Sequence, residues 1–377
     1  MMKLAERHYI RQSQESQELN DITHKSKNIY NRANYIVKQK YNNDGEYLNY
    51  HTIDKLMQKE DCYKSLPSKV SQQTLRILDR NWKAYFASKR AYFKNPSKFQ
   101  KCPRPPKYLD KQGNFITIYS TQSINKGNKL SKTNITFTTT RKPVEVRIIP
   151  KKFGFILEVV YEKECKLKKD NKKFASIDLG LNNLATITSD QSKPILVNGR
   201  MLKSINQYFN KYPTKKNLKK RYFRIENYFH HASKFVIDYC KHYDIGKIII
   251  GYNEGWKQKI KLGKKTNQNF CFLPFLKLIN KIKYKAELEG IEVILTEESY
   301  TSKSSFFDSD PLKSSEFSGK RIKRGLYKTK DGFIVNADVN GSLNIGRKVI
   351  HNYRVDRSLV ARPVKVNPLR TSFYKFL

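Results

Sequence analysis

The second half of the chain alternates between short apolar runs and long amphipathic segments, a pattern that restricts it to a β-sheet covered by helices. Residues 174–178, 184–188 and 194–198 come first and predict three adjacent strands, the first two paired as a hairpin. Residues 247–252 and 291–295 are two further apolar runs bounded by polar or glycine-containing segments. We therefore expect five strands in this half.

Two long helices are expected to separate the later strands. One has apolar positions between 218 and 239 and the other between 272 and 286, in both cases at three- and four-residue steps. A polar segment, residues 300–335, precedes a last helix that begins near Asp338. Three antiparallel strands followed by helix, strand, helix, strand and helix are the element order of an RNase H-like domain. The predicted fold class is therefore a multi-domain α+β chain that contains such an α/β domain.

Three short acidic signatures lie where this pattern ends a strand or begins a helix. They are Ile177-Asp178-Leu179-Gly180, Thr296-Glu297-Glu298-Ser299-Tyr300-Thr301-Ser302 and Asn336-Ala337-Asp338-Val339-Asn340-Gly341. Carboxylates that converge in space bind Mg²⁺ or Mn²⁺, and two such ions about 4 Å apart catalyse phosphodiester hydrolysis. Two simpler explanations stay open, because Asp178 could bond the backbone of the following turn and Asp338 could cap the last helix.

Acidic residues are scarce in this chain, with 33 Asp and Glu against 75 Lys and Arg and a net charge of +42. A small soluble domain usually carries a net charge of about 2–8 in magnitude. A cationic excess of this size repels itself unless a polyanion neutralises it, so nucleic acid is the expected partner.

The cysteines are isolated from one another and form no Cys-x-x-Cys pair; they are Cys62, Cys102, Cys165, Cys240 and Cys271. This usage indicates a reducing compartment, with neither a disulfide framework nor a sequence-local zinc site. The first twelve residues lack the apolar core of a signal peptide, and no apolar run is long enough to span a membrane. We expect a cytoplasmic, nucleoid-associated protein that does not contact membranes.

The first hundred residues predict one strand and two long helices. Residues 2–10 favour a strand, and apolar residues between 19 and 36 at helical spacing predict the first helix. Ser68 is expected to cap the second helix. The apolar face of that helix includes Trp82 and Tyr85, for which we expect core packing, with base stacking as the alternative.

A proline-rich string, Cys102-Pro103-Arg104-Pro105-Pro106-Lys107-Tyr108, ends the helical part. Apolar runs separated by Gly, Asn and Pro then predict four strands, at residues 115–119, 134–138, 144–149 and 155–161. Short strands at this spacing fit a small β-barrel. Residues 166–173 form a charged linker.

Several strings in this chain resemble those of one known family. They are Lys69-Val70-Ser71-Gln72-Gln73 with Asn81-Trp82-Lys83, Ile177-Asp178-Leu179-Gly180 with Leu184-Ala185-Thr186, Ser299-Tyr300-Thr301-Ser302-Lys303, and Asn336-Ala337-Asp338-Val339-Asn340-Gly341. In order, they are similar to the N-terminal helical region, the first RuvC motif, the entry to the nucleic-acid-binding insert and the third RuvC motif of the TnpB/OrfB proteins of insertion sequences. Those proteins are relatives of the type V CRISPR effectors.

The resemblance covers nearly the whole chain and implies an RNA-guided DNA endonuclease. Its partners would be a guide RNA from the transposon end and a double-stranded DNA target beside a short adjacent motif. The implied parts are a β-barrel (WED-like) domain at 1–10 and 101–168, a helical recognition (REC-like) domain at 11–100, a RuvC-like nuclease domain at 172–299 and 336–352, a nucleic-acid-binding insert at 300–335 and a C-terminal tail at 353–377. We expect a monomer or a dimer on the RNA.

The chain departs from the family pattern at the second RuvC motif. The family usually ends that strand with Glu, whereas Gly251 stands at this place here. A subset of the family carries a relocated glutamate after the next strand, and Glu298 matches that relocation. Glu297 would point the opposite way if the strand continued. We therefore favour Glu298 over Glu297, with Glu254 as the third candidate.

The insert is the second departure, because relatives carry two Cys-x-x-Cys pairs there that bind zinc. This chain has Ser305 and Asp308, then approximately Lys328 and Asp331, at the matching places, so we predict no zinc. The candidate nucleic-acid contacts are basic residues, namely Arg104 and Lys107 before the barrel strands and Lys320, Arg321, Lys323 and Arg324 in the insert. A solvent-exposed charge run is the alternative for the basic string in the insert.

The first hypothesis is a metal-dependent, RNA-guided DNA nuclease in which Asp178, Glu298 and Asp338 are both catalytic residues and ligands of Mg²⁺ or Mn²⁺. The alternative is a nuclease-inactive, RNA-guided DNA-binding repressor. Gly251 motivates that alternative, since the loss of one ligand weakens metal binding. A transposase that joins DNA by itself shares the fold and the acids, but the resemblance argues against it.

Overall fold

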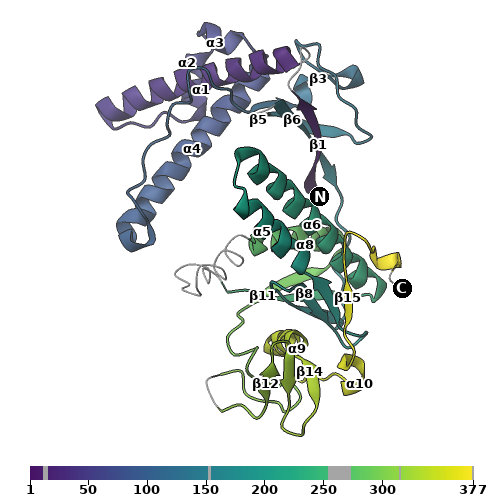
Figure 1. The fold of residues 1–377 in the computed structure, drawn as a ribbon. Helices are drawn as coiled ribbons and strands as arrows, with labels where there is room; N and C mark the ends of the chain where they lie inside the picture. The colour runs from purple at the N-terminus through teal and green to yellow at the C-terminus, as the bar shows by residue number, and fades with distance from the viewer. Residues whose placement is uncertain (12–15, 152–153, 254–272, 314–315, 376–377) are drawn as a thin grey trace. The chain divides into compact units, whose positions relative to one another are not determined.

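The computed structural model describes residues 1–11, 16–151, 154–253, 273–313 and 316–375. The chain forms two compact units, Met1–Glu164 and Cys165–Leu377, which are described separately (Figure 1). No helix among the described residues has the length and apolar content needed to cross a bilayer. The predicted residue Phe272 and the candidate ligand Glu254 lie outside the described residues.

The helices of the first unit pack around a buried aromatic residue. They are α1 (Gln17–Asp44), α2 (Tyr50–Met57), α3 (Asp61–Lys64) and α4 (Ser68–Lys94). Trp82 is 0% exposed, and its indole Nε1 donates a hydrogen bond to Asn34 Oδ1 at 3.0 Å, so the expected core packing of Trp82 is confirmed. Ser68 is the first residue of α4 and makes no capping bond, because Pro67 precedes the helix at the N-cap position.

An open antiparallel sheet completes this unit. Its strands are β1 (Met2–Arg11), β2 (Thr117–Ser120), β5 (Pro143–Lys151) and β6 (Gly154–Lys163), in the order β1-β6-β5-β2. The two end strands, β1 and β2, do not pair with each other, so the described strands do not form the predicted closed barrel.

The segment expected as a strand at 134–138 is largely irregular. A separate hairpin, β3 (Ile124–Asn125) with β4 (Lys129–Leu130), precedes it, and Thr136 adds a single bridge to Lys129. Asn128 and Lys132 have left-handed backbone conformations, with φ of 56° and 58°. Asn128 lies in the turn between β3 and β4 and Lys132 in the turn after β4, so the chain turns twice just before the segment that was expected to be a strand.

The second unit contains a six-stranded sheet in the order β11-β10-β7-β8-β9-β15. The strands are β7 (Phe174–Asp178), β8 (Asn183–Thr188), β9 (Ile195–Asn198), β10 (Lys247–Gly251), β11 (Glu292–Thr296) and β15 (Val364–Val366). Strand β8 is antiparallel to β7 and β9, whereas β10 is parallel to both β7 and β11. These strands match the five runs predicted from the sequence, with β15 added at one edge.

Helices cover both faces of this sheet (Figure 1). Helices α5 (Arg200–Lys211), α6 (Lys215–His242) and α8 (Phe275–Leu288) share one apolar core with Ile177 of β7 and Ile248 of β10. Helix α9 (Ala337–Val349) shares a second core with Phe174 and Ile249. Because successive strand residues face opposite sides, β7 and β10 pack against helices on both faces and are mostly apolar in their buried parts, with buried Ser176 bonded to Thr188 as the exception in β7.

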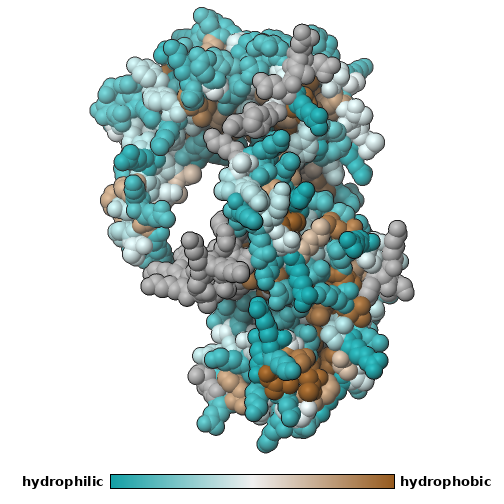
Figure 2. Space-filling model, in the orientation of Figure 1, coloured by the Kyte–Doolittle hydropathy of each residue, from teal (hydrophilic) through white to brown (hydrophobic). Residues whose placement is uncertain are grey.

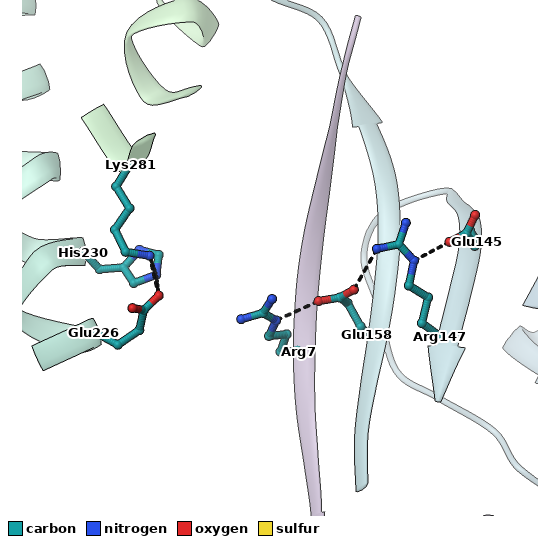
Figure 3. Close-up of polar contacts among 7 residues, drawn as sticks. All are labelled: Arg7, Glu145, Arg147, Glu158, Glu226, His230 and Lys281. Atoms are coloured by element: carbon teal, nitrogen blue, oxygen red, sulfur yellow. Dashed lines mark hydrogen bonds and ion pairs between the residues drawn. The ribbon is translucent and has the colours of Figure 1, made fainter. Parts of the chain in front are cut away.

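An ion pair ties α8 to α6. Lys281 Nζ donates a hydrogen bond to Glu226 Oε1 at 2.6 Å, and His230 Nε2 lies 2.9 Å from the same ammonium group (Figure 3). The two helices therefore present their apolar faces to the sheet in one fixed register.

The insert is a small antiparallel sheet of β12 (Lys320–Lys323), β13 (Leu326–Lys328) and β14 (Ile334–Asn336). Tyr327 and Val335 bury one side of it against α9. Hydrophobic side chains gather on the visible face in the region of β14 (Figure 2), and the exposed apolar residues of this sheet are Ile322, Leu326 and Ile334.

The segment 353–377 differs from the expected separate tail. It contains α10 (Arg357–Val360), then β15, which extends the six-stranded sheet by pairing in parallel with β9. Phe373 follows and is 1% exposed, packed against the rings of Phe235 and Tyr239 on α6. The last part of the chain thus belongs to the core of the second unit.

Replacement of Phe373 by alanine should destabilise the second unit by about 3–5 kcal/mol, because it removes a buried aromatic ring. Tyr374 is the neighbouring aromatic residue and is 58% exposed, so Tyr374→Ala is the matched control and should change stability by less than about 0.5 kcal/mol. Urea unfolding followed by circular dichroism measures both changes. Equal effects of the two substitutions would contradict the placement of Phe373 in the core.

Candidate functional site

Asp178 is the last residue of the central strand β7, directly before the turn Leu179-Gly180. The residue lies at the edge of the sheet where β7 ends and is half-buried. Burial raises the pKa of Asp178 to about 8, and the negative charges of Glu298 and Asp338 add to the rise. The nearby guanidinium of Arg321 opposes it.

Asp338 lies in the first turn of α9, where its side chain is free of a capping role. The cap is Asn336, whose Oδ1 accepts hydrogen bonds from the backbone N–H groups of Asp338 and Val339 at 3.0 and 3.2 Å. Asp338 Oδ2 instead accepts a hydrogen bond from Asn183 Nδ2 of β8, at 2.8 Å. The helix-capping explanation for Asp338 is therefore wrong, and the N-terminal dipole of α9 favours its negative charge.

Glu298 follows β11 in a turn that is fixed on both sides. Its backbone N–H donates to Asn253 Oδ1 at 2.8 Å, and its carbonyl accepts from the Thr301 hydroxyl at 2.8 Å. Burial raises the pKa of Glu298 to about 7, and the charge of Lys348 opposes this rise. The side chain of Glu297, in contrast, is 69% exposed and lies 4.0 Å from Lys348. Of these two neighbours, only Glu298 interacts with Asp178 strongly enough to shift its pKa.

The structure brings the three predicted carboxylates into electrostatic contact. Within the described ranges, no three or more His, Cys, Asp or Glu side chains lie close enough to one another to hold a metal ion. Asp178 therefore has two further carboxylates nearby, without a closed cage of metal ligands. The oxygen-only donors of the site suit a hard cation such as Mg²⁺ or Mn²⁺, and a cation would offset the repulsion that raises the pKa of Asp178.

The string that begins α9 brings this helix close to β7. A methyl group built on Gly341 would lie 3.0 Å from Asp178 Oδ2, so a small residue allows the close approach. The hydroxyl of Ser342 lies 3.0 Å from the carbonyl oxygens of both Ser176 and Thr186. Gly341 and Ser342 of this string thus bring α9 against the strands that carry Asp178 and Asn183.

The same helix also holds the start of the insert. Asn340 and Asn344 are one helical turn apart and fully buried. Asn340 Nδ2 donates to the Ser304 carbonyl at 2.8 Å, and Asn344 Nδ2 donates to the carbonyls of Thr301 and Ser304 at 2.9 and 2.7 Å. These bonds fix the segment that follows Glu298.

Carboxylates and hydroxyls form a hydrogen-bond network where zinc-binding cysteines were considered. Ser305 Oγ donates to Asp308 Oδ2 at 2.6 Å, and the backbone N–H of Lys330 donates to the same oxygen at 2.9 Å. Asp310 is buried and accepts from the backbone N–H groups of Ser305 and Ser318, at 2.8 and 3.1 Å. These bonds connect the two ends of the insert directly, and the network was not recognised from the sequence.

A basic cleft of about 480 Å³ lies beside Asp338 and Asn183. Its cationic lining residues are Arg200, Arg321, Arg324 and Lys365. Arg321 and Arg324 were predicted as nucleic-acid contacts, whereas Lys320 and Lys323 are exposed on β12 and do not line the cleft. Arg200 and Lys365 come from α5 and β15, two elements that the sequence analysis did not recognise.

A second basic cleft, of about 700 Å³, lies within the first unit. Arg76, Arg80 and Lys83 of α4 line it at four- and three-residue steps, a spacing visible in the sequence but not singled out there. Arg147 of β5 lines it from the sheet.

Buried Glu158 holds Arg147 toward this cleft. Arg147 donates hydrogen bonds to Glu145 and to Glu158 Oε2, the latter at 3.1 Å, and Arg7 Nε donates to Glu158 Oε1 at 2.8 Å (Figure 3). The ion pairs cross three neighbouring strands in direct register. The predicted contacts Arg104 and Lys107 are exposed in an extended segment of the same unit.

Two family models match parts of the chain. Residues 158–220 match a family described as "Probable transposase", the OrfB type, and residues 275–345 match the TNB domain of the Cas12f1-like type. The first match includes Asp178, and the second includes Glu298 and Asp338. These two parts of the chain are thus similar to OrfB-type and Cas12f1-like proteins.

A curated relative is the CRISPR-associated endodeoxyribonuclease Cas12f2 of Micrarchaeota archaeon (strain CG1_02_47_40), which is 27% identical over 241 residues. The match covers 55% of this chain and 43% of the relative, so the chain spans less than half the length of that protein. Together with the family models, this match confirms the predicted relationship to the TnpB/OrfB proteins and the type V CRISPR effectors.

Two cryo-EM structures are also similar, at low level. The Cas12f1–sgRNA–target DNA complex has a TM-score of 0.35 and 14% identity, over 93% of this chain and 100% of that chain. The CRISPR-Cas12f ternary complex has a TM-score of 0.34 and 14% identity, over 91% of this chain and 83% of that chain. These TM-scores are too low to support an argument about individual residues or domains.

Asp178→Asn should stabilise the metal-free protein at pH 8. The native state keeps a proton on Asp178 up to about pH 8, whereas the unfolded chain loses it near pH 4. The free energy of unfolding of the wild type therefore decreases as the pH rises from about 4 to about 8. The asparagine variant does not show this decrease, so its free energy of unfolding should exceed that of the wild type by about 2 kcal/mol or more at pH 8 but by little at pH 4. Denaturant unfolding in EDTA at several pH values checks this, and a gain independent of pH would contradict it.

Asp310→Ala should loosen the insert, because it leaves the backbone N–H groups of Ser305 and Ser318 without their charged acceptor. The insert should lose about 2–3 kcal/mol of local stability, and faster proteolysis within residues 300–335 would report this loss. Exposed Glu316→Ala is the matched control and should change nothing. A zinc chelator should leave the wild-type cleavage pattern unchanged, and chelator-induced loosening would contradict the prediction of a zinc-free insert.

Proposed function

We propose that this chain is an RNA-guided DNA endonuclease and that its second unit is an RNase H-like (RuvC) nuclease domain. The observation that carries the proposal is that Asp178, at the end of β7, has Glu298, after β11, and Asp338, at the start of α9, near enough for their charges to add to the rise in its pKa. Mutual repulsion of carboxylates destabilises the fold. In a chain with 75 basic and 33 acidic residues, a structural role would be served better by pairing each acid with a lysine or arginine.

The relatives support the choice of substrate. The sequence match to a protein named an endodeoxyribonuclease supports DNA, and the net charge of +42 supports binding to nucleic acid in both units. Guide RNA from the transposon end and double-stranded DNA with a short adjacent motif are the proposed partners, bound by a monomer or a dimer of the protein in the cytoplasm. The cleft lined by Arg76, Arg80, Lys83 and Arg147 would hold nucleic acid in the first unit.

The chemistry of the site follows from its side chains. Asp178, Glu298 and Asp338 would hold Mg²⁺ or Mn²⁺, and the bound cations supply an activated water and offset charge on the leaving oxygen. Asn183 fixes the orientation of the Asp338 carboxylate through its hydrogen bond. Arg321 and Arg324 line the adjacent cleft and bind phosphates of the strand to be cut.

A second candidate function is RNA-guided DNA binding without cleavage, as in a repressor. The specific observation in its favour is that the described carboxylates do not form a closed metal-binding group. The retained coupling of the three acids favours the nuclease, since an inactive site has no use for an arrangement that raises the pKa of Asp178.

The test combines the protein with its co-transcribed RNA, Mg²⁺ and a plasmid that carries the matching target. The wild-type complex should cut the plasmid, whereas Asp178→Ala and Glu298→Gln should each lower the rate by at least about 100-fold, more than loss of an outer-sphere partner usually costs. Glu297→Gln is the matched control and should cut at the wild-type rate, because Glu297 is exposed.

The same experiment separates the two functions. Target binding without cleavage by the wild-type complex, measured by gel shift, would identify the repressor. Equal cleavage by wild type and Asp178→Ala would reject the proposed site.

A further inference from the structure

We propose that Gly251 and Asn253 are positioning residues for Glu298, so that the end of β10 determines where the third carboxylate lies. We call residues 251–253 the seat. The inference rests on the proposed function, because it assigns a role to residues that adjoin the proposed metal site without being ligands. Nothing in the family matches assigns a role to either residue.

Gly251 provides the space that the Glu298 side chain fills. A methyl group built on Gly251 would lie 2.8 Å from Glu298 Cγ, 2.8 Å from Glu298 Oε1 and 2.5 Å from Ile345 Cδ1 of α9. Real side chains do not approach each other so closely, so even alanine at position 251 would displace Glu298, Ile345 or both. Glycine therefore leaves room here for the Glu298 and Ile345 side chains in their observed positions, and its role is close approach rather than a special backbone conformation.

Asn253 fixes the backbone from which Glu298 projects. Strands β10 and β11 pair in parallel up to Gly251 and Thr296, and the Tyr252 N–H then donates to the Thr296 carbonyl at 2.8 Å. One residue further, Asn253 Oδ1 accepts a hydrogen bond from the Glu298 N–H at 2.8 Å. The side chain of Asn253 thus replaces the strand pairing that ends at Thr296.

The far side of the turn is held as well. The Thr301 hydroxyl donates to the Glu298 carbonyl at 2.8 Å, and Tyr300 between them has a left-handed backbone with φ of 63°. With the backbone fixed on both sides, the Glu298 side chain lies over Gly251, beside Ile345 of α9. Residues around a metal ligand that fix its orientation typically change metal affinity by 10–100-fold when they are replaced.

The test measures metal binding by the full-length chain apart from nuclease activity. The variants are Gly251→Ala combined with Ile345→Val, Asn253→Ala, Glu298→Ala, Asp178→Ala and the control Glu297→Ala. Valine at 345 lacks Cδ1, so the double variant removes the contact with α9 and keeps the contact with Glu298. Isothermal titration with Mn²⁺ gives the affinity, and the melting temperature in EDTA gives the stability.

We expect the double variant and Asn253→Ala to bind Mn²⁺ at least tenfold more weakly than wild type, with melting temperatures in EDTA close to the wild-type value. Glu297→Ala should bind as wild type does. The double variant combined with Glu298→Ala should bind Mn²⁺ no more weakly than Glu298→Ala alone, because the seat acts through Glu298. Wild-type affinity in the double variant, or weaker binding by the combined variant than by Glu298→Ala alone, would overturn the proposal.

Other outcomes distinguish the seat from the proposed function. If the double variant does not fold, Asn253→Ala decides alone, and unchanged affinity in that variant overturns the proposal. If Glu298→Ala binds Mn²⁺ as tightly as wild type while Asp178→Ala does not, the metal site stands without Glu298 and the seat is rejected. If Asp178→Ala also binds as wild type does, the proposed nuclease site is rejected as well.

Discussion

Helix α9 packs on β7 partly through apolar residues shared with Phe174 and partly through small and polar residues that also reach β8, and this contact fixes the parts of the second unit relative to one another. Gly341 lets the helix backbone approach the Asp178 carboxylate, and Ser342 bonds to carbonyl groups of both strands. The next helical turn holds the beginning of the insert through Asn344. A bulky apolar residue at Gly341 would separate helix and sheet, and both the carboxylates and the insert would lose their common support.

Strong hydrophobic periodicity made most of the fold predictable. The strands that include Asp178 and Gly251 are buried on both faces and bounded by turn residues, so their positions follow from the sequence. Strand β12 has no such signal, because all four of its residues are exposed, and β15 is only three residues long. The small barrel at 1–10 and 101–168 was predicted from run spacing and from the family resemblance, and run spacing does not report the left-handed turns at Asn128 and Lys132.

The candidate site was predictable only in part. The position of Asp178 at a strand end was visible in the sequence, and Glu298 was chosen over Glu297 by strand alternation and family resemblance. The contacts that orient these acids were not visible, because Asn183 is 155 residues from Asp338 and Asn253 is 45 residues from Glu298. Hydrogen bonds between such distant positions depend on the register of the completed sheet rather than on any local pattern.

The pairing of β1 with β6 has a consequence for how the first unit folds. Met2 pairs with Lys163 and Arg11 with Gly154, so β1 pairs with β6, its one neighbour among the described strands, after nearly the whole unit has been synthesised. Contacts of such sequence separation form slowly. Until then β1 is a ten-residue extended segment that could associate with other nascent chains. Its outward face carries Lys3, Arg7 and Arg11. Repulsion between these like charges keeps such segments apart until β1 pairs with β6.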